Sequence, residues 1–249
     1  MQPHRNRYWL NADPENPVAF QSQVKVVCDL YQAAANLHSL GTHLISCDEM
    51  TAIQALERAH PTLPMRPGHV EHQEFEYIRH GTQSLIANLE VATGQVITPS
   101  LGATRTEADF AFHISQTIDT DPNAEWIFIT DQLNIHQSES LVRLVQERCQ
   151  IQTDLGVKGR YGILQSMQTR AAFLSNPTHP IRFVYVPKHT SWLNQIEIWF
   201  SIVARRLLKR ASFTSINDLR QRIFSFIEYF NRTMAKPFNW KYTGEKCSA

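Results

Sequence analysis

The twelve residues EWIFITDQLNIH, numbers 125 to 136, hold the pattern that decides the fold of this chain. Their first half, Glu125–Thr130, is a compact apolar run rich in β-branched and aromatic residues, which is typical of a buried strand. The run stops at Asp131, and Asn134 and His136 add polar groups directly beyond it. An aspartate after a strand is more often a turn former or a helix cap. Its role therefore depends on the residues at the ends of the other strands.

A second short apolar run ends in the same way. Residues 43–47 predict a buried strand, and Asp48 comes directly after it. Because the ends of neighbouring strands open onto a common crevice, we expect Asp48 and Asp131 to converge there. A third carboxylate, Glu197, lies in SWLNQIEIWFS on the predicted helix that comes after the strand at residues 181–186. Its apolar neighbours predict that this carboxylate points toward the sheet rather than toward solvent.

Three carboxylates in one crevice would repel one another and raise one another's pKa unless a cation bound there. Mg²⁺ suits such a site because it prefers hard oxygen ligands, and Mn²⁺ is the alternative. Two such ions, roughly 4 Å apart, would activate a water or hydroxyl and stabilise the leaving oxygen in phosphodiester displacement. Taken alone, Glu197 is equally well an ordinary helix residue that neighbours Arg205.

The rest of the pattern predicts an α/β chain with a mixed sheet, without a strict βαβ alternation. Other helices are predicted at residues 18–40, 106–117, 138–149 and 215–230. Other strands are predicted at residues 74–79, 84–91 and 95–100, and these three form an antiparallel meander. Prolines and a glycine interrupt residues 51–72, so no long element is expected there.

The composition describes a globular chain with an uneven charge distribution. Its 249 residues are 43% hydrophobic, which is enough for the core of one large domain. The whole chain has 24 Lys and Arg against 23 Asp and Glu, but residues 188–249 hold 11 against 4. A basic C-terminal quarter predicts a polyanionic partner. The alternative is a basic helix face that only contacts solvent.

Cysteine and histidine spacing argues against disulfides and zinc fingers. The four cysteines lie far apart and form no Cys-x-x-Cys pair, so buried free thiols in a reducing compartment are expected. His69 and His72 have no second ligand pair at metal-site spacing, so no zinc site is expected there. The sequence has no apolar signal region and no membrane-length run, which predicts a soluble, cytoplasmic protein.

Around the three carboxylates the sequence resembles the DDE transposases of the mariner-like superfamily, and most of all their bacterial insertion-sequence members. The motifs are CDEM at Asp48, DQLNIH at Asp131 and SWLNQIEIWFS at Glu197. YIRHGTQSLIANLEVATGQV and YFNRTMAKPFNWKYTG extend the likeness over nearly the whole chain, from about Tyr8. Each fragment alone is weak, whereas the joint pattern is specific.

The resemblance implies a ribonuclease-H-like catalytic domain over residues 42–249, preceded by an arm and helix at residues 1–41 that serve as a linker region. It implies that Asp48, Asp131 and Glu197 are the catalytic residues and hold two Mg²⁺ ions, with Asn134 and His136 in support. The implied activity is cleavage at transposon ends and strand transfer into target DNA, usually at a TA-containing site. A nucleoid-associated protein acting as a homodimer fits this activity.

Two features depart from the family pattern. Asp131 and Glu197 are 66 positions apart, which is longer than in typical members, so residues 151–180 look like an insertion. Its Gly, Lys and Arg residues suggest a lid that contacts DNA. The helix at residues 18–40 also leaves no room before Asp48 for the usual helix-turn-helix region. We therefore expect a truncated or separately encoded catalytic half, with end recognition supplied by another chain.

Basic and aromatic residues around Glu197 are predicted to contact double-stranded DNA. They are Lys188, His189, Trp192, Asn194, Arg205, Arg206, Lys209 and Arg210. The last four spread over about 12–20 Å of one predicted helix, which suits contacts to successive phosphates. Trp192 is expected either to stack on a distorted base or to anchor its helix as a buried side chain. Trp199 and Phe200 are assigned to the core.

Two other functions remain open from the sequence. One is a related nuclease that cuts structured DNA without strand transfer. The other is a DNA-binding remnant without catalysis, although the presence of all three carboxylates argues against it.

Overall fold

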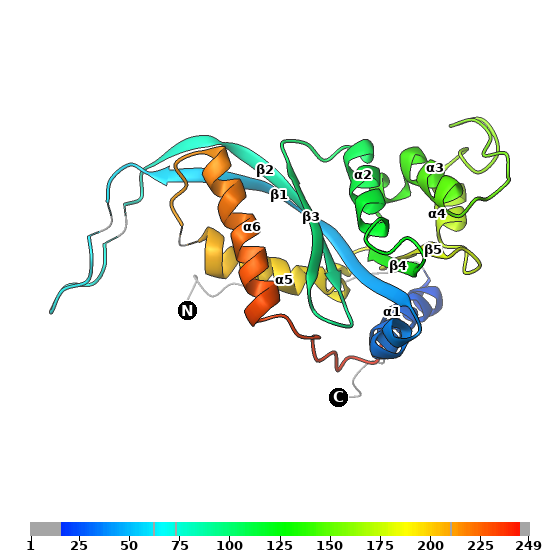
Figure 1. Cartoon of the computed structure of the whole chain (residues 1–249), viewed down its shortest axis with the longest axis horizontal. Helices are drawn as coiled ribbons and strands as arrows, with labels where there is room; N and C mark the ends of the chain where they lie inside the picture. The colour runs from blue at the N-terminus through cyan, green and yellow to red at the C-terminus, as the bar shows by residue number, and fades with distance from the viewer. Residues whose placement is uncertain (1–15, 62, 73, 210, 245–249) are drawn as a thin grey trace.

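The computed structural model describes residues 16–61, 63–72, 74–209 and 211–244, and in this part of the chain a five-stranded sheet lies between two layers of helices (Figure 1). The strand order is β3-β2-β1-β4-β5. Strands β1 to β3 pair antiparallel, whereas β1, β4 and β5 run parallel. The predicted mixed sheet flanked by helices is therefore confirmed.

The elements come in the order that the sequence pattern indicated, with different lengths. The strands are β1 Thr42–Arg58, β2 Tyr77–Glu90, β3 Val96–Gly102, β4 Glu125–Thr130 and β5 Ile181–Tyr185. The α-helices are α1 Pro17–Ser39, α2 Glu107–Ile118, α3 Glu139–Arg148, α4 Met167–Leu174, α5 Ile196–Val203 and α6 Ile216–Thr233. Short helical turns lie at η2 Asn134–Gln137 and η3 Ser191–Leu193, and one π-helical turn, Ala204–Leu208, continues α5.

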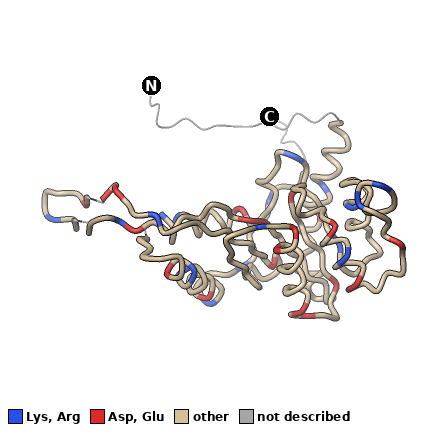
Figure 2. Tube along the Cα trace, turned by 90° about the horizontal axis from the view of Figure 1, so that it is seen from above, with Lys and Arg blue, Asp and Glu red and all other residues tan. Residues whose placement is uncertain are grey.

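The first two strands are much longer than predicted. The strands expected at residues 74–79 and 84–91 are one strand, β2, and β1 runs on to Arg58 through a region where no long element was expected. The two strands pair as far as Arg58 and Tyr77 and form a ribbon that projects from the body of the molecule (Figures 1 and 2). Register shifts between Met50 and Leu56 break the period-two alternation, so the local sequence pattern does not show this strand.

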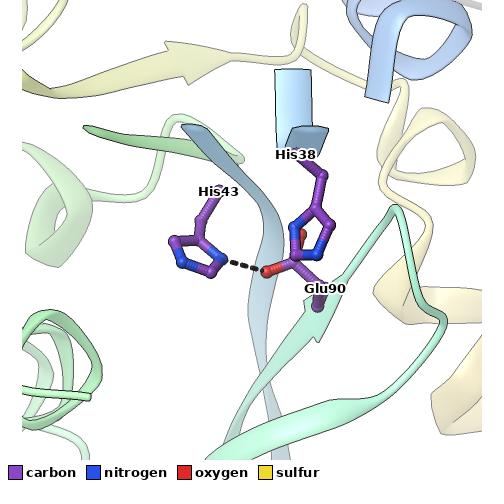
Figure 3. Close-up of side chains that lie close together, drawn as sticks. All are labelled: His38, His43 and Glu90. Carbon is purple, nitrogen blue, oxygen red and sulfur yellow. Dashed lines mark hydrogen bonds and ion pairs between the residues drawn. The ribbon is translucent and has the colours of Figure 1, made fainter. Parts of the chain in front are cut away.

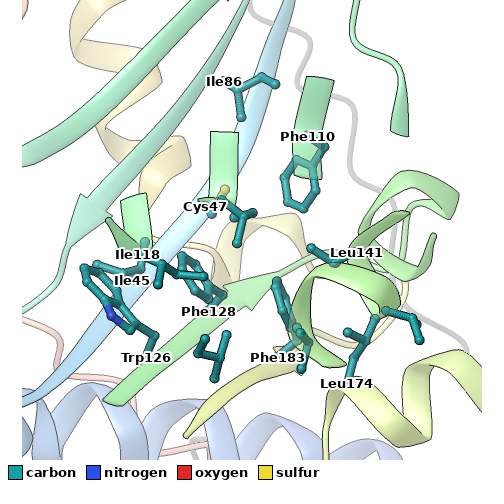
Figure 4. Close-up of a cluster of buried hydrophobic side chains, with 14 of the residues drawn as sticks. Ile45, Cys47, Ile86, Phe110, Ile118, Trp126, Phe128, Leu141, Leu174 and Phe183 are labelled. Carbon is teal, nitrogen blue, oxygen red and sulfur yellow. The ribbon is translucent and has the colours of Figure 1, made fainter. Parts of the chain in front are cut away.

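Successive residues of the central strands point to opposite faces of the sheet, and each face has its own core. Ile45 and Phe128 pack in the cluster beneath α2, α3 and α4 (Figure 4). Their neighbours Leu44 and Ile127 pack against α1 on the other face. A third cluster lies under α5 and α6, where Trp199 and Phe200 are buried as predicted.

Helix α1 is part of the domain core and not only a linker. It begins at Pro17, after the N-cap Asn16, whose side chain accepts a hydrogen bond from the Ala19 N–H. One face of the helix buries Val24, Val27, Cys28, Tyr31 and Ala34. The hydroxyl of Tyr31 donates to the carbonyl of Leu193 at 2.8 Å, so the helix is fixed to the connection that precedes α5. The predicted arm lies mostly outside the described residues.

The segment at residues 151–180 folds onto the domain. It contributes the buried residues Leu155, Leu164 and Leu174 to the cluster under α2 to α4. The guanidinium of Arg170, which is only 9% exposed, donates to the carbonyls of Gln137 and Leu164. Because Gln137 ends η2, this buried arginine joins the segment to the polypeptide just beyond β4.

Within the described residues the cysteines are free thiols, and the helices are unsuited to spanning a membrane. Cys28 and Cys47 are buried free cysteines, Cys149 is half-buried and free, and Cys247 lies outside the described residues. Within the described part of the chain, every helix is too short or too polar to cross a bilayer.

Asn231 of α6 hydrogen-bonds to the edge strand β3, so its substitution tests the packing of α6 against the sheet. Its side-chain oxygen accepts from the Val96 N–H at 2.9 Å, and its amide nitrogen donates to the Val96 carbonyl at 2.7 Å. We expect Asn231→Ala to lower the free energy of unfolding by about 1–3 kcal/mol, because both backbone groups lose their partner. Urea unfolding would measure this, with exposed Gln221→Ala on the same helix as the control. Equal stabilities of the two variants would contradict the assignment.

Candidate active site

Asp48 and Asp131 lie at the same edge of the sheet because their strands are neighbours and run parallel. Ser46 of β1 pairs with Ile129 of β4, and each aspartate comes two residues later. Asp48 is 7% exposed, whereas the side chain of Asp131 is 39% exposed. Asp131 follows the end of β4 as predicted, but Asp48 lies within β1, which continues to Arg58, so the expectation that Asp48 follows a strand end is wrong. The β1–β4 pairing nevertheless brings the two carboxylates close enough for the charge of Asp131 to raise the pKa of Asp48.

Asn194 connects this edge to the start of α5. Its amide nitrogen donates to the carbonyl of Cys47 at 3.0 Å and to a carboxylate oxygen of Asp48 at 3.2 Å. Its oxygen accepts from the hydroxyl of Ser46, which in turn accepts from the Ile196 N–H at 2.8 Å. The predicted DNA contact from Asn194 is wrong for this structure, because the residue is fully buried and all its polar atoms are used internally. It orients Asp48 instead.

Glu197 is brought to the same edge by the first turn of α5. Its backbone N–H donates to the Asn194 carbonyl at 3.1 Å, so the glutamate lies one turn beyond the residue that binds Asp48. Partial burial, and then the charge of Asp131, raise the pKa of Glu197. The side chain is nevertheless exposed. The expectation that it points away from solvent is wrong, because Ile196 and Trp199 occupy the buried positions of this helix.

His136 and Glu49 form a buried ion pair beside the aspartates. His136 donates from Nε2 to Glu49 Oε1 at 2.8 Å and from Nδ1 to Asp131 Oδ1 at 2.7 Å. Burial by itself lowers the pKa of His136, but its hydrogen bonds to Asp131 and Glu49, together with the charges of these two acids, raise it to about 10. The imidazole is therefore a cation that holds Asp131 in place. The supporting role expected of His136 can be described as positioning Asp131 and Glu49.

Glu49 is the site residue that the sequence pattern did not reveal. It comes directly after Asp48 on β1, so the two side chains point to opposite faces of the sheet. Asp48 therefore contacts Asn194, whereas Glu49, with a side chain only 1% exposed, contacts His136. The signal that was available is the adjacent acidic pair in CDEM, since a charged residue on each face of a buried strand requires a partner on each side.

The two aspartates have opposite pKa shifts. Burial raises the pKa of Asp48 to about 7, and the charges of Asp131 and Glu49 add to this effect, while a hydrogen bond from the Glu49 N–H opposes it. Burial also acts to raise the pKa of Asp131, but its hydrogen bond with His136 and the charge of that cation prevail, and the pKa is lowered. The site thus holds a carboxyl whose protonated form is favoured by burial beside one whose ionised form is favoured by the neighbouring cation.

The carboxylates of this edge fit a divalent cation. Hard oxygen donors suit Mg²⁺ or Mn²⁺, and burial, which raises the pKa of Asp48, disfavours its charged form unless a cation is bound. Asp48, Glu49 and His136 offer ligand atoms within 4.8 Å of one another. Both ring nitrogens of His136 already donate to carboxylates, however, so the histidine positions the acids and the carboxylate oxygens remain as ligands.

The remaining predicted residues lie around Glu197 with different exposures. Those on the surface are Asn134, Lys188, His189, Trp192, Arg205, Arg206 and Lys209, and Arg210 is outside the described residues. Trp192 is 53% exposed and contacts Tyr242 edge to face, with ring centroids 5.3 Å apart, so the alternative of a buried anchor is wrong. Red and blue segments are interspersed along the trace in Figure 2, so the basic residues do not form a separate half of the molecule.

A mixed sheet of order β3-β2-β1-β4-β5, with Asp48 within β1 and Asp131 directly after the parallel strand β4, is the arrangement of a ribonuclease-H-like fold. The family model described as DDE superfamily endonuclease matches residues 43–220. The chain belongs to this family. A comparison with the curated proteins gives no match.

Solved structures with the same fold include three of the Mos1 mariner transposase. The paired end complex with Mn has a TM-score of 0.54 at 12% identity, covering 90% of this chain and 59% of that chain. The strand transfer complex matches with a TM-score of 0.51 at 12% identity, and the match covers 91% of this chain and 60% of that chain. The catalytic domain has a TM-score of 0.50 at 10% identity, covering 88% and 85%. The ribonuclease-H-like fold is confirmed, and the chain spans about three fifths of the two transposases in the complexes.

The raised pKa of Asp48 predicts an unusual effect of Asp48→Asn. The folded state binds more protons at this carboxyl than the unfolded state between pH 3.8 and about 7, so stability falls as the pH rises through that window. With a chelator present at pH 8, we expect Asp48→Asn to raise the free energy of unfolding by on the order of 1–3 kcal/mol. The gain should disappear near pH 4. Urea unfolding at both pH values measures it.

Asp29→Asn is the control for that substitution. Asp29 is 53% exposed on α1, paired with Lys25, and its loss removes the same charge from the chain. The Asp29→Asn variant should be no more stable than the unsubstituted protein at pH 8. Destabilisation by Asp48→Asn at pH 8 would contradict the account of a carboxyl destabilised by burial and neighbouring charge.

Proposed function

We propose that this chain is the catalytic domain of a transposase that cuts DNA at the ends of a mobile element and joins those ends to target DNA. The observation that supports the proposal is the placement of Asp48 in β1 and of Asp131 directly after the adjacent parallel strand β4, with Glu197 in the first turn of α5, where the charge of Asp131 helps to raise its pKa. Family membership and the fold shared with the Mos1 mariner structures support it.

In the proposed mechanism Asp48, Asp131 and Glu197 hold two divalent cations, Mg²⁺ or Mn²⁺. When bound, these ions supply Lewis-acid activation of the attacking oxygen and stabilise the leaving oxygen. The protein contributes the position of its carboxylates. Asn194 fixes Asp48, and His136 together with the Leu133 N–H fixes Asp131. Glu197 is exposed, so the third carboxylate is the one that DNA reaches from outside.

The proposed DNA path runs from the β5–α5 connection along α5. Lys188, His189 and Trp192 are exposed before Glu197, and Arg205, Arg206 and Lys209 are exposed after it. The Arg205 guanidinium donates back to the carbonyl and hydroxyl of Ser201, while no such bond fixes Arg206 among the described contacts. These cations would contact phosphates and would position DNA without reading its sequence.

Partners of the whole protein complete this proposal. A second copy of the chain and a separate helix-turn-helix chain would supply end pairing and end recognition, and the protein would act at the bacterial nucleoid. Residues 151–180 are proposed as an insertion that borders the DNA. Lys158 in this segment lies 3.6 Å from Glu107 and 3.8 Å from Glu139, so part of its charge is already balanced by the protein.

Removal of any one of the three carboxylates should abolish metal-dependent cleavage. We expect Asp48→Asn, Asp131→Asn and Glu197→Gln each to lower the rate of end cleavage by about 10²-fold or more, because loss of even an indirect metal partner costs 10–100-fold. The measurement is cleavage of a labelled transposon-end duplex with Mg²⁺ or Mn²⁺. Exposed Glu228→Gln on α6 is the control. Full activity in any of the three variants would remove that residue from the proposed set.

The same assay separates the proposed transposase from the two alternatives. Joined products in addition to nicks indicate strand transfer. Nicks without joined products indicate a nuclease, and a mobility shift without any metal-dependent cleavage indicates a DNA-binding remnant.

Arg206 tests the proposed DNA path. Each phosphate contact contributes about 0.9 to the slope of log affinity against log salt concentration. We therefore expect Arg206→Ala to weaken binding to unrelated sequences equally and to reduce that slope by about 1. Fluorescence anisotropy at several salt concentrations measures it. Arg143→Ala on α3, where the arginine pairs with Glu139, is the control, and an unchanged slope for Arg206→Ala would exclude this residue from the path.

A further inference from the structure

A second cluster of metal-binding side chains lies at the start of β1, separate from Asp48 farther along the same strand. His38 lies in the last turn of α1, His43 near the start of β1 and Glu90 at the end of β2 (Figure 3). Each offers one ligand atom, and these atoms lie within 4.8 Å of one another. We propose that His38, His43 and Glu90 bind a transition-metal ion, with Zn²⁺ as the best match.

Glu90 provides the first argument for a cation. The residue is only 3% exposed. Its Oε2 accepts a hydrogen bond from His43 Nδ1 at 2.7 Å, but its Oε1 is buried and has no hydrogen-bond partner among the described residues. A buried carboxylate oxygen without a partner is costly. A metal ion between Glu90, His43 and His38 would satisfy this oxygen.

The surroundings of His43 provide the second argument. Its other ring nitrogen, Nε2, faces Asp121 Oδ2 at 3.5 Å, and the ring is stacked on Trp126 with centroids 4.2 Å apart. Histidines that bind metals commonly present their second nitrogen to a carboxylate in this way, which fixes the tautomer and the ring orientation. When the ion binds, the proton on Nδ1 leaves to solvent and a bond from Nδ1 to the metal forms in its place.

The donor set selects the kind of ion. Two imidazole nitrogens and one carboxylate are typical of Zn²⁺ and other first-row transition metals, and they leave a coordination position open to water. Mg²⁺ prefers oxygen ligands and would not compete well here. His43 is five residues before Asp48 on the same strand, about 17 Å away at the usual rise, so the two sites are separate.

A second histidine–glutamate pair in the chain offers a direct comparison. His80 Nε2 and Glu57 Oε2 are also 2.7 Å apart. Their side chains are 28% and 32% exposed, so water reaches them, and no third metal-binding group from the described residues joins them in a cluster. The burial of Glu90 and the approach of His38 therefore distinguish the proposed site from an ordinary surface pair.

The ion would join three elements that are distant in the sequence. It would hold the end of α1 to the first residues of β1 and the last residues of β2, close to the turn at Gly41, whose φ of +84° suits glycine. Binding to the folded state alone would raise the melting temperature. The proposed ion is thus structural, and its presence does not depend on whether the chain is a transposase.

The test uses the full chain with both Asp48→Asn and Asp131→Asn, so that the carboxylate edge binds no metal. Isothermal titration with Zn²⁺ and the visible absorption of Co²⁺ would measure binding. We expect one saturable site in this protein and its loss in Glu90→Gln and in His38→Ala. Asp121→Asn should weaken binding about 10–100-fold. His80→Ala is the matched control and should retain the site.

His38 is exposed, so His38→Ala should leave the fold intact, which circular dichroism would check even if the buried Glu90→Gln variant unfolds. Zn²⁺ should raise the melting temperature of the parent protein with Asp48→Asn and Asp131→Asn, but should not raise it when His38→Ala is added. The proposal is overturned if the parent shows no saturable Zn²⁺ binding, if His38→Ala binds as the parent does, or if His80→Ala loses binding equally.

Discussion

The buried hydrogen bonds of Asn194 are the interaction on which the rest of the site depends. Through Ser46, Cys47 and Asp48 this one side chain fixes the first half of β1 to the connection that starts α5. The Ile196 N–H completes the network, so the first turn of the helix cannot move without breaking buried bonds. Glu197 lies in that turn. Its position relative to the aspartates is therefore set by packing inside the domain and not by the surface.

The electrostatics of the edge result from the same arrangement. Four acids are brought near one another. Among the described residues, the buried cation His136 pairs with two of them, and the exposed guanidinium of Arg105 lies 3.6 Å from Glu49. Asp131 and Glu49 are balanced by this imidazolium, whereas Asp48 is left with burial and like charge, which raise its pKa to about 7. A site prepared in this way favours a bound divalent cation, since the ion relieves the repulsion that the fold imposes. The metal requirement of the proposed chemistry thus has a structural origin.

Local sequence patterns predicted well the features that depend on local structure. The strand at Glu125–Thr130 was predicted to the residue, and helices α1, α2, α3 and α6 began within one residue of their predicted starts, because apolar periodicity and capping residues such as Thr106 act over a few positions. The long β1–β2 ribbon was missed. Its second half is formed by pairing between strands, with shifted register and little burial, so the interaction that defines it is not local. The same limit explains why Asn194 was predicted to contact DNA, although it is buried.

By itself the sequence determined the kind of fold, the aspartate directly after β4 and the glutamate on the helix after β5, because each rests on a short run of residues. Only the tertiary structure decided which polar groups are partners. Glu49 with His136, Asn194 with Asp48, and His38 with His43 and Glu90 meet through contacts between separate elements. Such pairs depend on strand pairing and on which face of a strand or helix is buried, and residue type alone does not specify either.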